Sequence, residues 1–143
     1  MVALSFSVFY DLLVKDTNDV YVAKRQTIRR WNERRQEAMK RLGIQVFWKQ
    51  RYKGQKLFDA ILTGEIIRVR WVKNIYDGKE VCTLQRGYAP DGWLCFFEAE
   101  LEDIALRDGF NSWNEMREWF VRKYGDALLK GDFAVIRFLK VAR

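Results

Sequence analysis

Short runs that alternate apolar and polar residues, separated by glycine, asparagine and aspartate turns, recur along most of this 143-residue chain. Such runs are typical of strands with one buried face. They predict strands over 4–9, 20–29, 44–48, 57–72, 81–84 and 133–139. The fourth of these is expected to bend at Gly64, and Asp77-Gly78 is a hairpin turn between 71–75 and 81–84.

Three helices are predicted between these strands. The first spans 31–42 and ends at Gly43, and the second spans 98–107. The third begins at a capping box formed by Ser112 and Glu115 and ends at Gly125. Because strands and helices do not alternate regularly, we expect an α+β fold, a small mixed β-barrel with two or three peripheral helices. The length fits a single domain over 1–143.

Positive charge is concentrated in one part of the sequence. The net charge is +7, and the segment 24–56 holds twelve Lys or Arg against only Glu33 and Glu37. Trp31, Trp48 and Tyr52 are interleaved with these cations. Cations suit a phosphate backbone and aromatic rings suit stacked bases, so the segment favours RNA or nucleotide binding. A solvated basic helix with core aromatics behind it is the alternative.

The residue types present exclude several kinds of chemistry. The chain has no histidine, which removes Ser/His/Asp and Cys/His catalysis and the commonest metal ligand. Its two cysteines have no Cys-x-x-Cys spacing, so free structural thiols are expected rather than a disulfide framework. No apolar run reaches the length of a membrane span. We therefore expect a cytoplasmic protein without membrane contact, metal or cofactor.

Two segments about eighty residues apart carry polar side chains that suit a small site. The first, 24–29, reads Lys-Arg-Gln-Thr-Ile-Arg and offers an amine, a hydroxyl and a guanidinium. The second, 108–115, places a carboxylate just ahead of the capped helix. In an ideal strand Lys24 and Thr27 point to opposite faces, so their convergence requires a bulge or a loop.

In these segments the chain resembles the ASCH family, the activating-signal-cointegrator homology domains, which have a PUA-like barrel. The resemblance covers most of the chain. Val22 stands where the family has a glycine, and Asp108 stands where its amidohydrolases have a glutamate. The matching residues are Lys24, Thr27 and Arg29, then Asp108-Gly109-Phe110, Ser112-Trp113, Tyr124-Gly125 and the closing strand.

The resemblance implies a PUA-like fold that binds RNA or a nucleotide in a basic cleft. It also implies an alternative, because some members deacetylate N4-acetylcytidine. Carried over by position, the catalytic residues are then Lys24, Thr27 and Asp108, with the hydroxyl as nucleophile and the amine as its base. The residues expected to contact nucleic acid are Arg25, Arg29, Arg30, Trp31, Arg34, Lys49, Arg51 and Tyr52.

Each of these residues also has a structural interpretation. Thr27 suits a strand, and Asp108 suits the cap of the turn at Gly109. The rings of Phe110, Trp113 and Tyr124 are expected in the core. A third functional hypothesis is a regulator that docks on a larger protein, such as the transcription machinery, through the aromatic segment 88–97.

Overall fold

The computed structural model describes residues 1–49, 54–85, 93–96 and 98–141, which form two compact units. Unit 1 comprises 1–27, 32–66 and 136–143, and unit 2 comprises 28–31 and 67–135. Two strands, β2 (Gln26–Arg30) and β8 (Phe133–Lys140), each continue from one unit into the other. Whether both units fold together as the predicted single domain stays a prediction.

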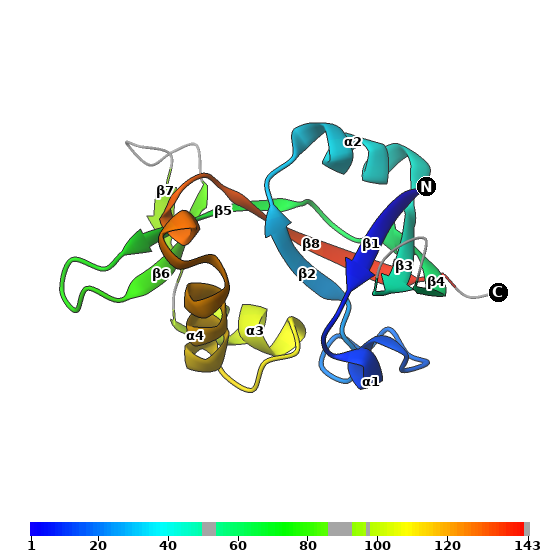
Figure 1. Ribbon diagram of the computed structural model, residues 1–143, viewed down its shortest axis with the longest axis horizontal. Coiled ribbons are helices and arrows are strands. Elements are labelled where there is room, and N and C mark those ends of the chain that lie inside the picture. Colours follow the sequence, from blue (N-terminus) through cyan, green and yellow to red (C-terminus); the bar gives the residue numbers. More distant parts are fainter. Residues whose placement is uncertain (50–53, 86–92, 97, 142–143) are drawn as a thin grey trace. The chain divides into compact units, whose positions relative to one another are not determined.

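Unit 1 is built on a sheet with one parallel and two antiparallel pairings (Figure 1). Its strands are β1 (Val2–Phe6), β3 (Ile44–Trp48), β4 (Gln55–Leu62) and the C-terminal part of β8. Val2 lies opposite Ile44 in the parallel pair, and Ala60 lies opposite both Ile44 and Lys140. The buried residues Leu4, Ile44, Val46 and Ala60 show that the centre of this sheet belongs to the core.

Helix α2 (Glu33–Leu42) connects β2 to β3 and begins where Asn32 caps it. Asn32 Oδ1 accepts the backbone N–H of Arg35 at 3.1 Å, which satisfies one of the donors that a helix start leaves unpaired. At the other end Gly43 adopts φ +77°, which only glycine enters readily. Met39 is buried while most other side chains of the helix are exposed. The helix predicted over 31–42 is confirmed, with its start two residues later.

Unit 2 contains the antiparallel strands β5 (Ile67–Lys73), β6 (Glu80–Gln85) and β7 (Trp93–Cys95). The predicted hairpin at Asp77-Gly78 is confirmed, because Gly78 adopts φ +68° and Lys73 lies opposite Glu80. The other edge of β5 pairs with the N-terminal part of β8. The single strand predicted over 57–72 is instead two strands, β4 and β5, because the chain turns at Gly64 with φ +70°.

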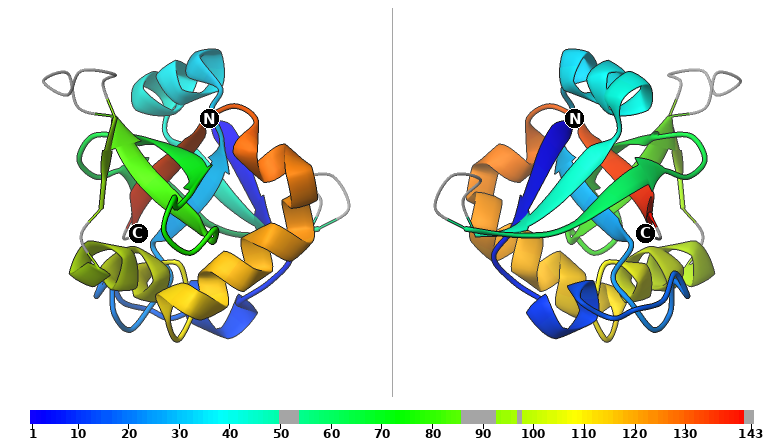
Figure 2. Two further views of the ribbon diagram at one scale, coloured as in Figure 1. Left: turned by 90° about the vertical axis from the view of Figure 1, so that its left-hand side faces the viewer. Right: turned by 90° about the vertical axis from the view of Figure 1, so that its right-hand side faces the viewer.

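Helices α3 (Glu98–Arg107) and α4 (Trp113–Tyr124) follow the strands of unit 2, and a short loop joins them (Figure 2). Ser112 Oγ accepts the backbone N–H of Glu115 at 3.1 Å, so the predicted cap is confirmed. The 3-10 helix η1 (Gly125–Leu129) then leads toward β8. The core here is aromatic: the Trp71 ring stacks on Trp113 and on Phe120, each at 5.3 Å.

The strands pair in the order β1-β3-β4-β8-β5-β6-β7, and β2 pairs with β8. This arrangement of a mixed sheet with several helices confirms the α+β class. In the part of the chain that the structure describes, no pairing joins β1 to β7, so a closed barrel is not shown.

Candidate functional site

The three predicted catalytic residues are all buried, although their side chains are polar. The exposed fractions are 3% for Lys24, 4% for Thr27 and 5% for Asp108. Lys24 and Thr27 belong to unit 1, whereas Asp108 directly follows α3 in unit 2. The approach of the Asp108 carboxylate to the Lys24 amine therefore stays a prediction.

Lys24 precedes strand β2 instead of lying within it. The predicted strand 20–29 was wrong in its first half, because Asp19 organises a turn there. The backbone carbonyl of Asp19 accepts the N–H groups of Val22 and Ala23, and the Asp19 side chain accepts the N–H of Tyr21. Strand alternation begins only at Gln26, so it does not force Lys24 and Thr27 onto opposite faces.

Two aromatic rings of unit 1 lie near the Lys24 amine. Its Nζ lies 5.8 Å from the ring centre of Phe6 and 5.3 Å from that of Phe9. Phe9 has a left-handed backbone with φ +64°, a conformation that is costly for a bulky residue. The backbone N–H of Lys24 donates to the carbonyl of Leu12 at 3.0 Å. The Phe9 ring therefore lies beside the amine on a residue whose backbone conformation is strained.

Arg25, one of the residues expected to contact nucleic acid, lies in the interior of unit 1 with only 1% exposure. Its guanidinium donates to the carbonyls of Leu13, Lys15 and Lys24 and to the side chain of Asn18. Burial lowers its pKa below the usual value for arginine, and the charge of Asp16 partly offsets this effect. These contacts give Arg25 a structural role, because it satisfies carbonyls of the 13–18 loop that have no strand partner.

The other predicted contact residues divide between the two units. Arg34 and Lys49 are exposed in unit 1, where Lys49 has φ +64°. Arg29 and Arg30 are half-buried in unit 2. Arg51 and Tyr52 lie outside the described residues, as does most of segment 88–97.

Arg30 performs a structural task beside η1. Its guanidinium donates to the carbonyls of Ala127 and Lys130, and lies 4.3 Å from the ring centre of Phe133. The Ala127 carbonyl also accepts the backbone N–H of Lys130, so the guanidinium links the last turn of η1 to the residue that follows it. Arg30 therefore fixes the turn that leads into β8.

Trp31 forms part of a cluster in unit 2 with Arg68, Arg70 and Asp132. The Arg68 guanidinium lies 4.5 Å from the centre of the Trp31 ring. Its Nε donates to Asp132 Oδ2 at 2.7 Å, and Arg70 Nε donates to Asp132 Oδ1 at 2.9 Å. The Arg68 and Arg70 side chains remain 38% and 44% exposed, whereas that of Asp132 is 6% exposed. One buried carboxylate thus holds two arginines at the surface; we call these four residues the arginine clamp.

The backbone of Asp132 completes the clamp, because its carbonyl accepts the N–H of Trp31 at 2.9 Å. Burial would raise the pKa of the Asp132 carboxyl, but the hydrogen bonds and charges of Arg70 and Arg68 outweigh it. The pKa of that group consequently lies below its usual value. Asp132 is ionised at neutral pH, which keeps both arginines in place.

Sequence reasoning did not single out Arg68, Arg70 or Asp132. A signal was present, since Arg68 and Arg70 alternate with the buried Val69 and Trp71 along β5. Period-two alternation places both arginines on the opposite face of the strand. The position of Asp132 beside them depends on the pairing of β5 with β8, which brings together residues far apart in the sequence.

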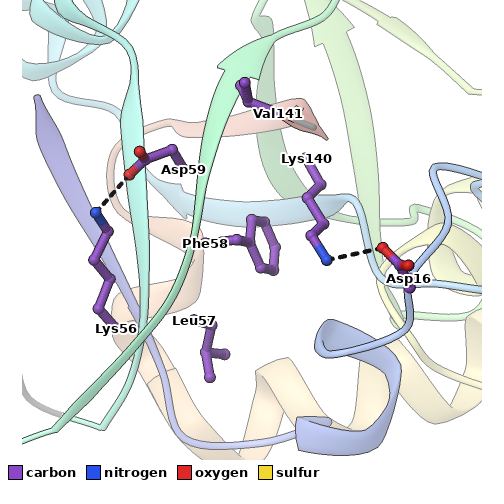
Figure 3. A pocket seen from close by; sticks show the side chains of 7 residues that line it. All are labelled: Asp16, Lys56, Leu57, Phe58, Asp59, Lys140 and Val141. Atoms are coloured by element: carbon purple, nitrogen blue, oxygen red, sulfur yellow. Dashed lines mark hydrogen bonds and ion pairs between the residues drawn. The ribbon is translucent and has the colours of Figure 1, made fainter. Parts of the chain in front are cut away.

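Unit 1 contains a cavity of about 540 Å³ beside β4 and the end of β8 (Figure 3). Leu57 and Phe58 point into it, and Lys140 and Asp16 lie across from them. The Lys140 amine lies 3.1 Å from Asp16 Oδ1. The cavity therefore combines an apolar wall with an accessible ion pair.

Neither a metal centre nor a membrane helix is found among the described residues. No three Cys, Asp or Glu side chains in these ranges come together as metal ligands. None of the described helices combines the length and apolar character needed to cross a bilayer.

Comparisons with known proteins identify no relative of this chain. No protein-family model matches it, and neither a curated protein nor a solved structure matches it.

Proposed function

We propose that this chain binds RNA or a nucleotide, and that the arginine clamp provides the principal contact surface. The ASCH resemblance, with its PUA-like barrel and basic cleft, is part of the same proposal. The observation that carries it is the pair of half-exposed guanidinium groups held by Asp132 beside Trp31.

Two features make such an arrangement suitable for a phosphate backbone. A guanidinium has five N–H donors in a planar fork, and the bond from Arg68 to Asp132 uses its Nε. Other donors of the fork are available for a phosphate. Because Asp132 already orders the side chain, binding costs less conformational entropy than ordering a mobile arginine.

Trp31 adds an aromatic surface next to these donors. It is half-buried, so its ring is only partly covered by unit 2. Bases of a single strand stack on aromatic side chains regardless of sequence, while phosphates pair with neighbouring arginines. The clamp therefore favours single-stranded RNA or a nucleotide over a duplex read through its grooves.

The direct test is fluorescence anisotropy with a labelled single-stranded RNA, using wild type and Arg68→Gln. We expect the wild type to bind and the variant to bind at least several-fold more weakly, because one charge-assisted phosphate contact is lost. Equal affinity would contradict the assignment of the clamp. The absence of any RNA or nucleotide binding by wild type would contradict the function itself.

A second candidate function is hydrolysis of an N4-acetylcytidine-type amide, favoured by the burial of Lys24, Thr27 and Asp108. Polar residues in the interior are uncommon and often mark a functional site. In this hypothesis the Thr27 hydroxyl attacks the acyl carbon and its proton passes to a neutral Lys24 amine. Asp108 assists proton delivery to the leaving amine, and water then cleaves the acyl-enzyme ester.

Incubation of wild type and Thr27→Ala with N4-acetylcytidine, free and within RNA, tests this candidate. We expect release of acetate and cytidine by wild type and none by Thr27→Ala, with RNA affinity unchanged. Thr27→Ser is the matched variant, since it keeps the hydroxyl and should retain turnover. No turnover by wild type would overturn the enzyme hypothesis and leave RNA binding in place.

A further inference from the structure

The unit 1 cavity has a wall shaped by an irregularity in strand β4. Val46 lies opposite Phe58, while the next residue, Phe47, lies opposite Lys56, so Leu57 is an extra residue in the pairing. A bulge of this kind turns two successive side chains toward one face of the strand. Leu57 and Phe58 accordingly both point into the cavity, and the ion pair of Lys56 and Asp59 borders it (Figure 3).

The opposite wall is anchored by Asn18 at the end of β8. Its side chain exchanges two hydrogen bonds with the backbone of Lys140, one accepted at 2.8 Å and one donated at 3.1 Å. Arg25 Nε also donates to Asn18, and its guanidinium lies 4.9 Å from the Phe58 ring centre. These contacts therefore fix the position of the Lys140 backbone relative to Phe58.

The two ion pairs that border the cavity differ in strength. Lys56 and Asp59 are 2.9 Å apart, and the Asp59 side chain is only 17% exposed. Asp16, by contrast, is 97% exposed, so water screens its attraction to Lys140. Asp16 is thus a weak counter-ion that an incoming anion can replace. The cavity lining holds two lysines and two carboxylates, and release of the exposed Asp16 leaves Lys140 as the cation that favours a negatively charged ligand.

We propose that this cavity binds a small organic anion, which displaces Asp16 from Lys140 through its carboxylate or phosphate and packs its apolar part on Leu57 and Phe58. A cavity of about 540 Å³ lies in the range of small-molecule sites. The ligand site lies wholly in unit 1 and does not depend on the arginine clamp of unit 2. If no anion binds in this cavity, the proposed RNA binding at the arginine clamp is not affected.

The test is an NMR titration of the labelled protein with two probes, indole-3-acetate as a carboxylate and AMP as a phosphate. Their neutral counterparts are indole-3-acetamide and adenosine, and inorganic phosphate supplies charge alone. We expect saturable shifts at the amides of Leu57, Asp59 and Lys140 with at least one of the two anionic probes. Whichever probe binds identifies the anionic group, and its neutral counterpart should bind at least tenfold more weakly.

Two substitutions move the affinity in opposite directions. Lys140→Gln removes the cation and should weaken binding about tenfold. Asp16→Asn removes the competing carboxylate and should tighten binding roughly two- to fivefold, the worth of an exposed ion pair. Leu57→Ala should weaken the binding of the organic probe and leave the binding of inorganic phosphate unchanged. Lys40→Gln and Glu37→Gln are matched controls, because that pair has the same 3.1 Å separation elsewhere in unit 1.

The outcomes separate the proposal from nonspecific attraction. Weaker binding in Lys140→Gln with tighter binding in Asp16→Asn supports it. Equal affinities in wild type and both variants overturn it, as does the absence of binding by both anionic probes. If inorganic phosphate binds as tightly as AMP and indole-3-acetate does not bind, the apolar wall contributes nothing and the organic ligand is rejected.

Discussion

The Arg68 guanidinium lies 4.5 Å from the centre of the Trp31 ring, and the same group donates from Nε to Asp132. A cation over an indole ring is stabilised by the electrons of the ring face. The ring and the carboxylate together restrict the arginine to a narrow range of positions. Unit 2 therefore presents a preformed cation beside an aromatic ring, a combination that some proteins use to bind single-stranded nucleic acids.

Trp31→Leu tests the aromatic half of this surface. We expect RNA affinity to fall about 5- to 150-fold, because a base stacked on an aromatic ring contributes about 1–3 kcal/mol. Trp119→Leu is the matched control: its ring is also half-buried in unit 2, and Lys123 Nζ lies 4.7 Å from its centre. Equal losses in both variants would show that Trp31 has no specific role.

Asp132→Asn tests the carboxylate that holds the clamp. The substitution should reduce the free energy of unfolding by about 1–3 kcal/mol at pH 7, because two arginines lose a charged acceptor. The pKa of Asp132 is lowered in the folded protein, so its contribution is complete above the unfolded value of about 3.9 and is lost as pH falls below it. Urea unfolding should be measured at pH 7, 5 and 3. The free energies of unfolding of wild type and Asp132→Asn should approach each other only at pH 3. A difference that stays constant from pH 7 to pH 3 would contradict this account.

Arg25→Met tests whether Arg25 is structural. The variant removes the donors to the carbonyls of Leu13, Lys15 and Lys24, and a buried acceptor without a partner costs about 1–3 kcal/mol. We expect a clear loss of stability in urea unfolding and unchanged RNA affinity below the new melting temperature. A stable variant with weakened RNA binding would instead show that Arg25 contributes to the RNA contact surface.

The thiol of Cys82 offers a test of burial in unit 2. Complete burial raises its pKa well above the usual value, because the thiolate loses its hydration. In a Cys95→Ser background, Cys82 should react slowly with DTNB at pH 8 and rapidly in urea, since the thiolate is the reactive form. Rapid reaction in the folded protein would contradict the burial of the Cys82 side chain in β6.

Local signals in the sequence were sufficient for most of the elements. Ser112 and Gly125 delimit α4, and Gly43 ends α2, because caps depend on residues within one turn of the helix. The strand predicted at 20–25 was wrong for a physical reason. Its alternating pattern was overridden by the turn at Asp19, whose hydrogen bonds to Tyr21, Val22 and Ala23 satisfy the backbone locally.

The candidate sites were less accessible to sequence reasoning. The charge of segment 24–56 drew attention to Arg25 and Arg30, yet both guanidinium groups are bonded to carbonyls inside their units. The arginine clamp depends on strand pairing across more than sixty residues, from Arg68 to Asp132. The cavity in unit 1 depends on a bulge at Leu57, which no local sequence pattern indicates.

The salt dependence of RNA binding tests the central claim most directly. Affinity of wild type and of Arg68→Gln/Arg70→Gln should be measured from low to high salt, with Arg117→Gln/Arg122→Gln on α4 as the control. If each clamp arginine contacts a phosphate, the log–log slope of the double variant should be shallower by about 1.4, since a single strand contributes about 0.7 per contact. The control should keep the wild-type slope. Identical slopes and affinities in all three proteins would contradict the arginine clamp as an RNA-binding surface.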